Sequence, residues 1–202
     1  MKNVTPHKGM SFSQIEIRDL VKSWAALSLA FGLLLSRSIF SIDFLLSILL
    51  AAFSAGVAFL LHELAHKYLA QKYHCWAEFR SNDTMLLVMI ALALFAGFIL
   101  AAPGAVHISG YISRKHYGYV SAAGPITNFI LAVVSLPFVF IFPSGILGSL
   151  FYYSLIINAW IGLFNMIPFG AFDGAKILLW NKTAYGVMVA IGFVLVGLSQ
   201  NL

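Results

Sequence analysis

Long apolar segments are the feature that most constrains what this chain can fold into. Six of them follow one another with short polar stretches between, at residues 24–40, 43–70, 84–102, 122–142, 150–167 and 183–199. A helix needs about 20 mostly apolar residues to cross the ~30 Å hydrocarbon core of a bilayer. Charged residues make up only 9% of the chain, whereas a soluble domain carries about 25%. The sequence therefore predicts an integral membrane protein.

The order of the segments predicts the architecture. We expect an all-α polytopic membrane protein, a bundle of five full spans plus one re-entrant segment with a short β-hairpin. The hairpin is placed at Pro103 and Gly104, because this turn-forming pair lies between short alternating runs. In the span that starts at Ala122, Pro125 is expected near the first turn, where its missing N–H costs nothing.

Charge and cysteine content narrow the functional classes. The net charge is +5, but so few residues are charged that the basic ones are better explained as determinants of membrane topology than as a nucleic-acid surface. We therefore expect a lipid bilayer, and no nucleic acid, among the partners. A single cysteine, Cys75, excludes an internal disulfide, so the fold is expected to be held by packing.

A histidine pair at the end of the second apolar segment carries the chemistry. In the stretch HELAH, His62 and His66 are four residues apart, which places their side chains one turn apart on one helix face. Two imidazoles in this arrangement can share one zinc ion, and Glu63 between them can act on a water molecule at that ion. Ionisable groups in an apolar helix are costly, so their presence indicates a function.

Zinc requires a third protein ligand, and few carboxylates are available. Asp43 lies about 28 Å along the helix from His62 and is out of reach. Glu78 and Asp83 follow in the next loop and remain alternatives. Asp173 is favoured because Pro168, Gly170 and Gly174 interrupt the helical pattern around it. Irregular backbone at membrane depth persists only where it is buried in protein or lines a wet cavity.

Three motifs together resemble those of the site-2 proteases, a family of intramembrane zinc metalloproteases. HELAH lies in a span, AAGPITN opens a later span and NMIPFGAFDG closes the next, in the order found in the family. The resemblance covers most of residues 44–180. It implies that His62, His66 and Asp173 bind one Zn²⁺ per chain and that Glu63 is the catalytic base.

The resemblance extends to two asparagines and has limits. Asn165 and Asn128 match family asparagines near the site, where substrate or oxyanion contact and a helix–helix hydrogen bond are equally good interpretations. Ala171 and Ala175 stand where many members have proline and glycine. We expect a compact form without PDZ or CBS domains.

The length of the chain suits one compact bundle, so we expect a single integral-membrane metalloprotease domain over residues 1–202. Residues 1–22 form a polar cytoplasmic head, 44–180 the catalytic core and 183–202 the last span.

Shared ligation of zinc constrains the membrane topology. If 84–102 crossed the bilayer, Asp173 and the histidines would lie on opposite sides. A re-entrant segment removes this conflict, and with a cytoplasmic N-terminus it leaves only Arg37, among all lysines and arginines, outside. The positive-inside rule therefore favours a site toward the cytoplasmic face, in what we expect to be the plasma membrane.

These features predict an intramembrane zinc endopeptidase that cleaves a single-span membrane protein in regulated intramembrane proteolysis. Two alternatives remain: a metal transporter and a catalytically inactive binder of membrane helices. A transporter needs ligands along a continuous path, yet the spans contain almost no other ionisable residues. The remaining histidines His74, His107 and His116 are interpreted as surface or interfacial.

Overall fold

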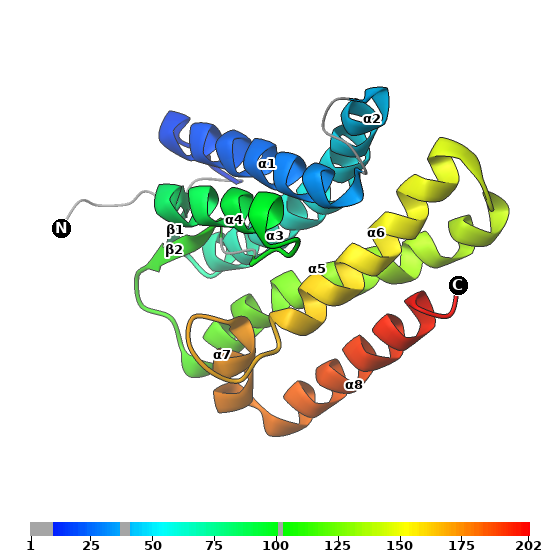
Figure 1. Ribbon diagram of the computed structural model, residues 1–202. Coiled ribbons are helices and arrows are strands. Elements are labelled where there is room, and N and C mark those ends of the chain that lie inside the picture. Colours follow the sequence, from blue (N-terminus) through cyan, green and yellow to red (C-terminus); the bar gives the residue numbers. More distant parts are fainter. Residues whose placement is uncertain (1–9, 37–40, 101–102) are drawn as a thin grey trace.

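The computed structural model describes residues 10–36, 41–100 and 103–202. Predictions that concern Lys2, Lys8 and Arg37 therefore lie outside the described residues. The described chain is mainly helical, with one two-stranded sheet (Figure 1). Its elements are α1 (Gln14–Leu35), α2 (Ile42–Ala51), η1 (Ala52–Gly56), α3 (Val57–Lys72), β1 (Trp76–Ser81), α4 (Asp83–Phe95), β2 (Gly104–Ser109), α5 (Arg114–Ile141), α6 (Gly145–Phe164), α7 (Asp173–Trp180) and α8 (Lys182–Ser199).

Four helices are long and apolar enough to cross a membrane. They are the continuous helix Ile42–Lys72, and α5, α6 and α8. Helix α4 is apolar but has only 13 residues, about 20 Å of helix against the ~30 Å of a bilayer core. Helix α1 has sufficient length, but its first half carries Glu16, Arg18, Asp19 and Lys22.

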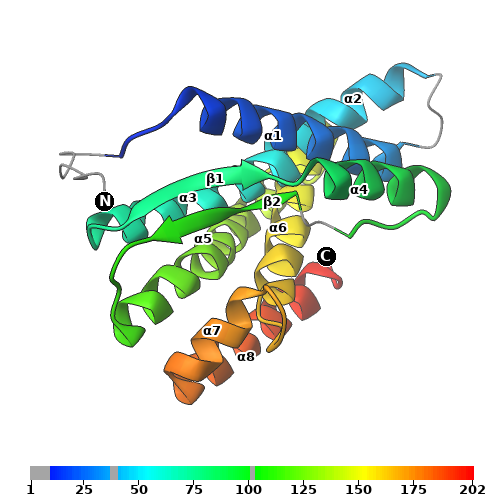
Figure 2. The ribbon, with the colours of Figure 1, turned by 90° about the vertical axis from the view of Figure 1, so that its left-hand side faces the viewer.

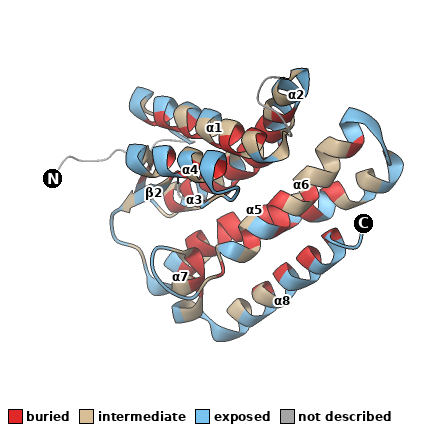
Figure 3. Cartoon of the chain, viewed as in Figure 1, coloured by how far each residue is buried: buried red, intermediate tan, exposed pale blue. Residues whose placement is uncertain are grey.

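The outer faces of the helices are exposed and apolar, as expected of a membrane protein. Exposed positions follow the outward sides of α5 and α8 (Figure 3). They include Ile130, Phe193 and Val194, each more than half exposed. Such side chains are stabilised by lipid rather than by water.

The two strands of the sheet are not the adjacent pair that the sequence predicted around Pro103 and Gly104. A strand does begin at Gly104, but its partner is β1, with Trp76 opposite Ser109 and Ser81 opposite Gly104. Helix α4 is inserted between the two strands (Figure 2). The prediction was wrong about the partner because alternation in sequence indicates a strand without showing which segment it pairs with.

The segment inserted between β1 and β2 begins and ends at the same end of the sheet. Ser81 and Gly104 are paired, and the Asn82 N–H donates to the Pro103 carbonyl at 2.9 Å. Gly104 is tightly packed there, since a Cβ would lie 2.2 Å from the Arg80 carbonyl oxygen. Residues 82–103 therefore form an excursion whose two ends are adjacent.

Helix α1 covers the outer edge of β1. A Glu16 carboxylate oxygen accepts the Phe79 N–H at 2.9 Å, and Asp19 accepts the Ser81 N–H at 3.4 Å. The other Glu16 oxygen pairs with the buried Lys67 ammonium of α3. One edge of the sheet is thus closed by side chains of α1.

Pro125 lies elsewhere in its helix than the sequence predicted. Helix α5 begins at Arg114, capped by Ser113, so Pro125 is well inside the helix rather than in its first turn. An interior proline removes one backbone hydrogen bond, which membrane helices tolerate when neighbours satisfy the freed carbonyl. The prediction was wrong because the polar start of α5, residues 114–121, was not recognised as helical.

Candidate metal centre

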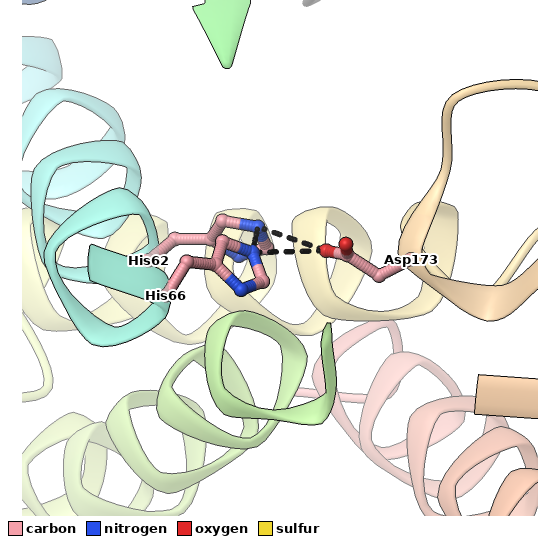
Figure 4. Close-up of side chains that lie close together, drawn as sticks. All are labelled: His62, His66 and Asp173. Atoms are coloured by element: carbon pink, nitrogen blue, oxygen red, sulfur yellow. Dashed lines mark hydrogen bonds and ion pairs between the residues drawn. The ribbon is translucent and has the colours of Figure 1, made fainter. Parts of the chain in front are cut away.

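His62, His66 and Asp173 come together in the interior of the bundle. The two histidines lie one turn apart on α3, and Asp173 is the first residue of α7 (Figure 4). The two Nε2 atoms are 3.0 Å apart, and Asp173 Oδ2 lies 3.4 Å from His62 Nε2 and 3.0 Å from His66 Nε2. All three side chains are buried.

The interrupted segment before Asp173 turns the chain back toward α3. Gly170 has a φ of 67°, a left-handed conformation that favours glycine. The Gly174 N–H donates to the Asn165 carbonyl at 2.7 Å, and a Cβ at Gly174 would lie 2.2 Å from the Met166 carbonyl oxygen. The glycines identified in the sequence therefore permit the turn that delivers Asp173.

Hydrogen bonds fix which nitrogen of each histidine faces the centre. His62 Nδ1 lies 2.6 Å from Asn128 Oδ1, and His66 Nδ1 lies 2.7 Å from the Val120 carbonyl. Both partners are acceptors, so each Nδ1 carries the proton and donates it. In a neutral imidazole this leaves the Nε2 lone pair free for a metal.

An amide ladder supports the orientation of His62. Asn128 Nδ2 donates to Asn158 Oδ1 at 2.9 Å, and Asn158 Nδ2 donates to the Ser154 carbonyl at 2.9 Å. Since the last acceptor is a backbone carbonyl, both amides have one favoured orientation. Sequence reasoning missed Asn158, although an amide within an apolar span was a signal that could have found it.

The three groups fit a zinc ion. Two atoms bound about 2.0 Å from a tetrahedral zinc are roughly 3.3 Å apart, and the observed separations are 3.0, 3.0 and 3.4 Å. Two unprotonated Nε2 atoms at 3.0 Å repel each other unless a cation lies between them. Two imidazoles and a carboxylate are also a donor set that zinc prefers. Among the described residues this is the group able to hold a metal.

Gly124 of α5 leaves the space that the centre needs. A Cβ there would lie 2.4 Å from His66 Nε2 and 2.5 Å from His62 Nε2. Even an alanine would therefore collide with the atoms that face the metal position. The close approach of α5 to the two imidazoles explains why the sequence has glycine before Pro125.

The Asp173 carboxylate also has a partner on its own helix. Lys176, one turn further along α7, donates to Asp173 Oδ1 at 3.2 Å. The second oxygen, Oδ2, is left to face the histidines.

A cavity of about 320 Å³ opens onto the three groups. Glu63 and Asn165 line it with them, so both are placed where they can contact a substrate. Asn128 is instead fully buried behind His62. Asn165 Nδ2 donates to the Ile161 carbonyl at 3.0 Å, which leaves its amide oxygen free of that bond.

One wall of this cavity is the second edge of the sheet. Paired residues of an antiparallel sheet alternate between exchanging hydrogen bonds and pointing their backbone groups away. Phe79 points its N–H at Glu16, so its partner Val106 must also point its N–H and carbonyl outward, away from β1. The Val106 backbone interacts there with Glu63. Gly104 and Ile108, two residues to either side, share this orientation and line the cavity.

The alternative third ligand lies elsewhere. Glu78 pairs with Arg80 and accepts a hydrogen bond from the Ser13 hydroxyl. Asp83 pairs with Lys22. Neither carboxylate belongs to the histidine group. His116 also lies outside that group and stacks on Tyr73, with ring centroids 4.0 Å apart.

Comparison with known proteins gives a consistent result. No protein-family model matches the chain, and no solved structure does. Over 188 residues, 92% of this chain, it is 36% identical to the Methanocaldococcus jannaschii protein named "Putative zinc metalloprotease MJ0611", of which it covers 93%. It is 32% identical over 123 residues to "Zinc metalloprotease MJ0392" of the same organism, 60% of this chain but 31% of that longer protein. The chain therefore belongs to the zinc metalloprotease family that these two archaeal proteins represent.

Proposed function

We propose that this chain is an intramembrane zinc endopeptidase of the site-2 protease type. His62, His66 and Asp173 hold one zinc ion per chain, and Glu63 is the catalytic base. The observation that carries the proposal is the buried convergence of two Nε2 atoms and one carboxylate oxygen beside Glu63, in a bundle whose outer helix faces are apolar.

The residues around the centre divide the work of hydrolysis. Bound zinc supplies Lewis-acid activation of water and of the peptide carbonyl. Glu63 takes a proton from the attacking water and gives it to the amine that leaves when the C–N bond breaks. Asn165 lies on the cavity wall, where the second hydrogen of its Nδ2 can be donated to the substrate carbonyl. Asn128 acts through His62, whose ring it orients.

We propose that the substrate adds as a strand to the free edge of β2. Gly104, Val106 and Ile108 present outward backbone groups along a cavity that also contains Glu63. A peptide bond in a helix is shielded by its own hydrogen bonds, so cleavage requires an extended segment. Within the described chain no strand lies on this side of β2, and pairing with such an edge holds a peptide extended, by β-augmentation.

We propose five membrane spans and a re-entrant segment. Besides the four apolar helices, α1 carries its charged Glu16 and Asp19 inward, whereas Ile15, Ile17 and Val21 face outward and are at least half exposed. Apolar side chains outside and carboxylates inside suit a helix in lipid, and the exposed Arg18 lies in its first half, where it can reach the membrane surface. The adjacent ends of residues 82–103 support an excursion that returns to its own side.

This topology places the site toward the cytoplasm of a plasma membrane, and the N-terminus with it. The expected substrate is a single-span membrane protein. A cysteine introduced at Ser113 tests the arrangement in intact cells. It should be protected from a membrane-impermeant thiol reagent added outside, and labelling there would contradict the topology.

The decisive test compares the wild type with Glu63→Gln. Both are purified with zinc and incubated with a labelled single-span reporter. We expect cleavage by the wild type alone, stopped by a chelator, with zinc bound at one per chain in both. An empty metal site would contradict the metalloprotease assignment. Cleavage by Glu63→Gln at the wild-type rate would remove Glu63 from the mechanism.

A further inference from the structure

A second groove lies outside the metal centre, between α3, α5 and α8. It has a volume of about 710 Å³, within the range of about 300–1,000 Å³ typical of ligand sites. It shares no lining residue with the cavity at the metal centre. We propose that it binds one anionic phospholipid, with acyl chains along the groove and the phosphate against Lys72, Lys115 and Lys182.

The body of the groove is apolar. Alanines line it from all three helices, Ala65, Ala122, Ala123 and Ala184. Ile126 and Val187 border it and are 42% and 54% exposed, so they gain from contact with hydrocarbon. Such a surface suits an acyl chain.

The mouth of the groove is aromatic. It lies where α3 ends and where α5 and α8 begin. Tyr73 stacks on His116, and Tyr119 packs edge-on against Trp180 with ring centroids 5.0 Å apart. Tyrosine and tryptophan concentrate at the depth of lipid headgroups. The aromatic end therefore marks where a headgroup would lie.

The same end carries positive charge without compensation. Lys72 precedes Tyr73, Lys182 is the first residue of α8, and the Lys115 ammonium lies 5.8 Å from the Tyr119 ring centre. None of the three takes part in a salt bridge within the described chain, where the salt-bridged carboxylates pair with other groups. Helices α5 and α8 also have no acidic residue in their first turns. Their positive dipole ends therefore add to the field of the lysines.

This charge decides between occupants. A substrate helix or a second copy of this chain would cover the apolar body but bring no necessary anion to the mouth. A phospholipid phosphate satisfies both regions at once.

The test uses zinc-loaded Glu63→Gln protein, so its outcome is independent of cleavage. Native mass spectrometry measures retention of phosphatidylglycerol and phosphatidylcholine from mixed micelles. We expect one phosphatidylglycerol per chain, with about tenfold preference over phosphatidylcholine. Lys72→Gln/Lys115→Gln/Lys182→Gln should abolish the preference. Lys2→Gln/Lys8→Gln/Arg18→Gln, which removes the same charge from the N-terminal segment, should keep it.

A second variant tests the apolar body. Ala184→Phe places a ring in the groove and should reduce retention of both lipids, while zinc content and monodispersity show that the fold is intact. Equal retention of the two lipids by the unsubstituted protein, or equal loss of preference in both triple variants, would overturn the proposal. A dimer that disappears with Ala184→Phe would assign the groove to a second copy instead.

Discussion

Two buried polar clusters lie on different faces of the same helix, α3, and they differ in the partners that they need. On one side of α3, Lys67 and Glu16 form an ion pair that is neutral in itself. Glu16 also accepts the Phe79 N–H, and Lys67 donates to the Ala77 carbonyl at 3.2 Å. On the other side, His66 meets His62 and Asp173 with two lone pairs and a negative charge facing one point.

The Glu16–Lys67 pair has the features of a structural contact, whereas the histidine–aspartate group has those of a metal site. The ion pair is satisfied by protein groups alone and ties α3 to α1 and β1. The histidine cluster presents two Nε2 atoms and a carboxylate oxygen to one point, an arrangement that can hold a metal ion. Adjacent residues of one helix can thus serve unlike purposes, and burial of charge alone does not distinguish them.

The largest effect is expected where the ion is held. Asp173→Asn removes the negative ligand and His66→Ala removes an Nε2 donor, so both should reduce zinc from one per chain to background and abolish cleavage. Elemental analysis after dialysis measures the zinc. Glu78→Gln is the matched control and should keep both zinc and activity. If Glu78→Gln lost its zinc while Asp173→Asn kept it, the third zinc ligand would be Glu78 and not Asp173.

The ion pair should respond in stability rather than chemistry. Lys67→Met leaves Glu16 buried without its partner, which costs about 3–5 kcal/mol. Thermal unfolding should show a large loss, while the zinc content of the folded fraction stays at one per chain. The double variant Glu16→Gln/Lys67→Met should recover much of this stability. A loss of zinc in the folded Lys67→Met protein would show that the two clusters are not separate.

The amide ladder should have an intermediate effect on the metal. Asn128→Leu removes the acceptor that fixes His62, and loss of such a partner lowers metal affinity by roughly 10–100-fold. Asn158→Leu, one step further away, should lower it less. Competition with a chromophoric chelator measures both. If the asparagines serve only helix packing, both variants will lose stability and keep their zinc affinity.

The smallest effect is expected at Lys176. Its bond to Asp173 Oδ1 is partly exposed, and such pairs contribute about 0.2–1 kcal/mol. Lys176→Gln should therefore weaken zinc binding only about two- to fivefold, and Lys176→Arg should restore it. If Lys176→Gln binds zinc as tightly as the wild type, Lys176 makes no contribution to the metal site.

Local spacing explains what the sequence could predict. His62, Glu63 and His66 follow from the pitch of a helix, and the apolar segments from the thickness of a bilayer. Asp173 was favoured because glycine and proline interrupt the pattern next to it, and the structure places it beside the two histidines. The pairing of β1 with β2, the place of Pro125 inside α5 and the role of Asn158 depend on contacts between distant segments. Periodicity carries no information about such contacts.

The meeting of α3 with α7 has a consequence for how the protein is made. The histidines belong to the first half of the sequence and Asp173 to the second. During synthesis, the helix that carries His62 and His66 is made before Asp173, so the two histidines at first have no carboxylate facing them. The chain must be extended past residue 173 and folded back on itself before an ion can be enclosed. Within the proposed function, an unfinished chain is therefore harmless to its neighbours.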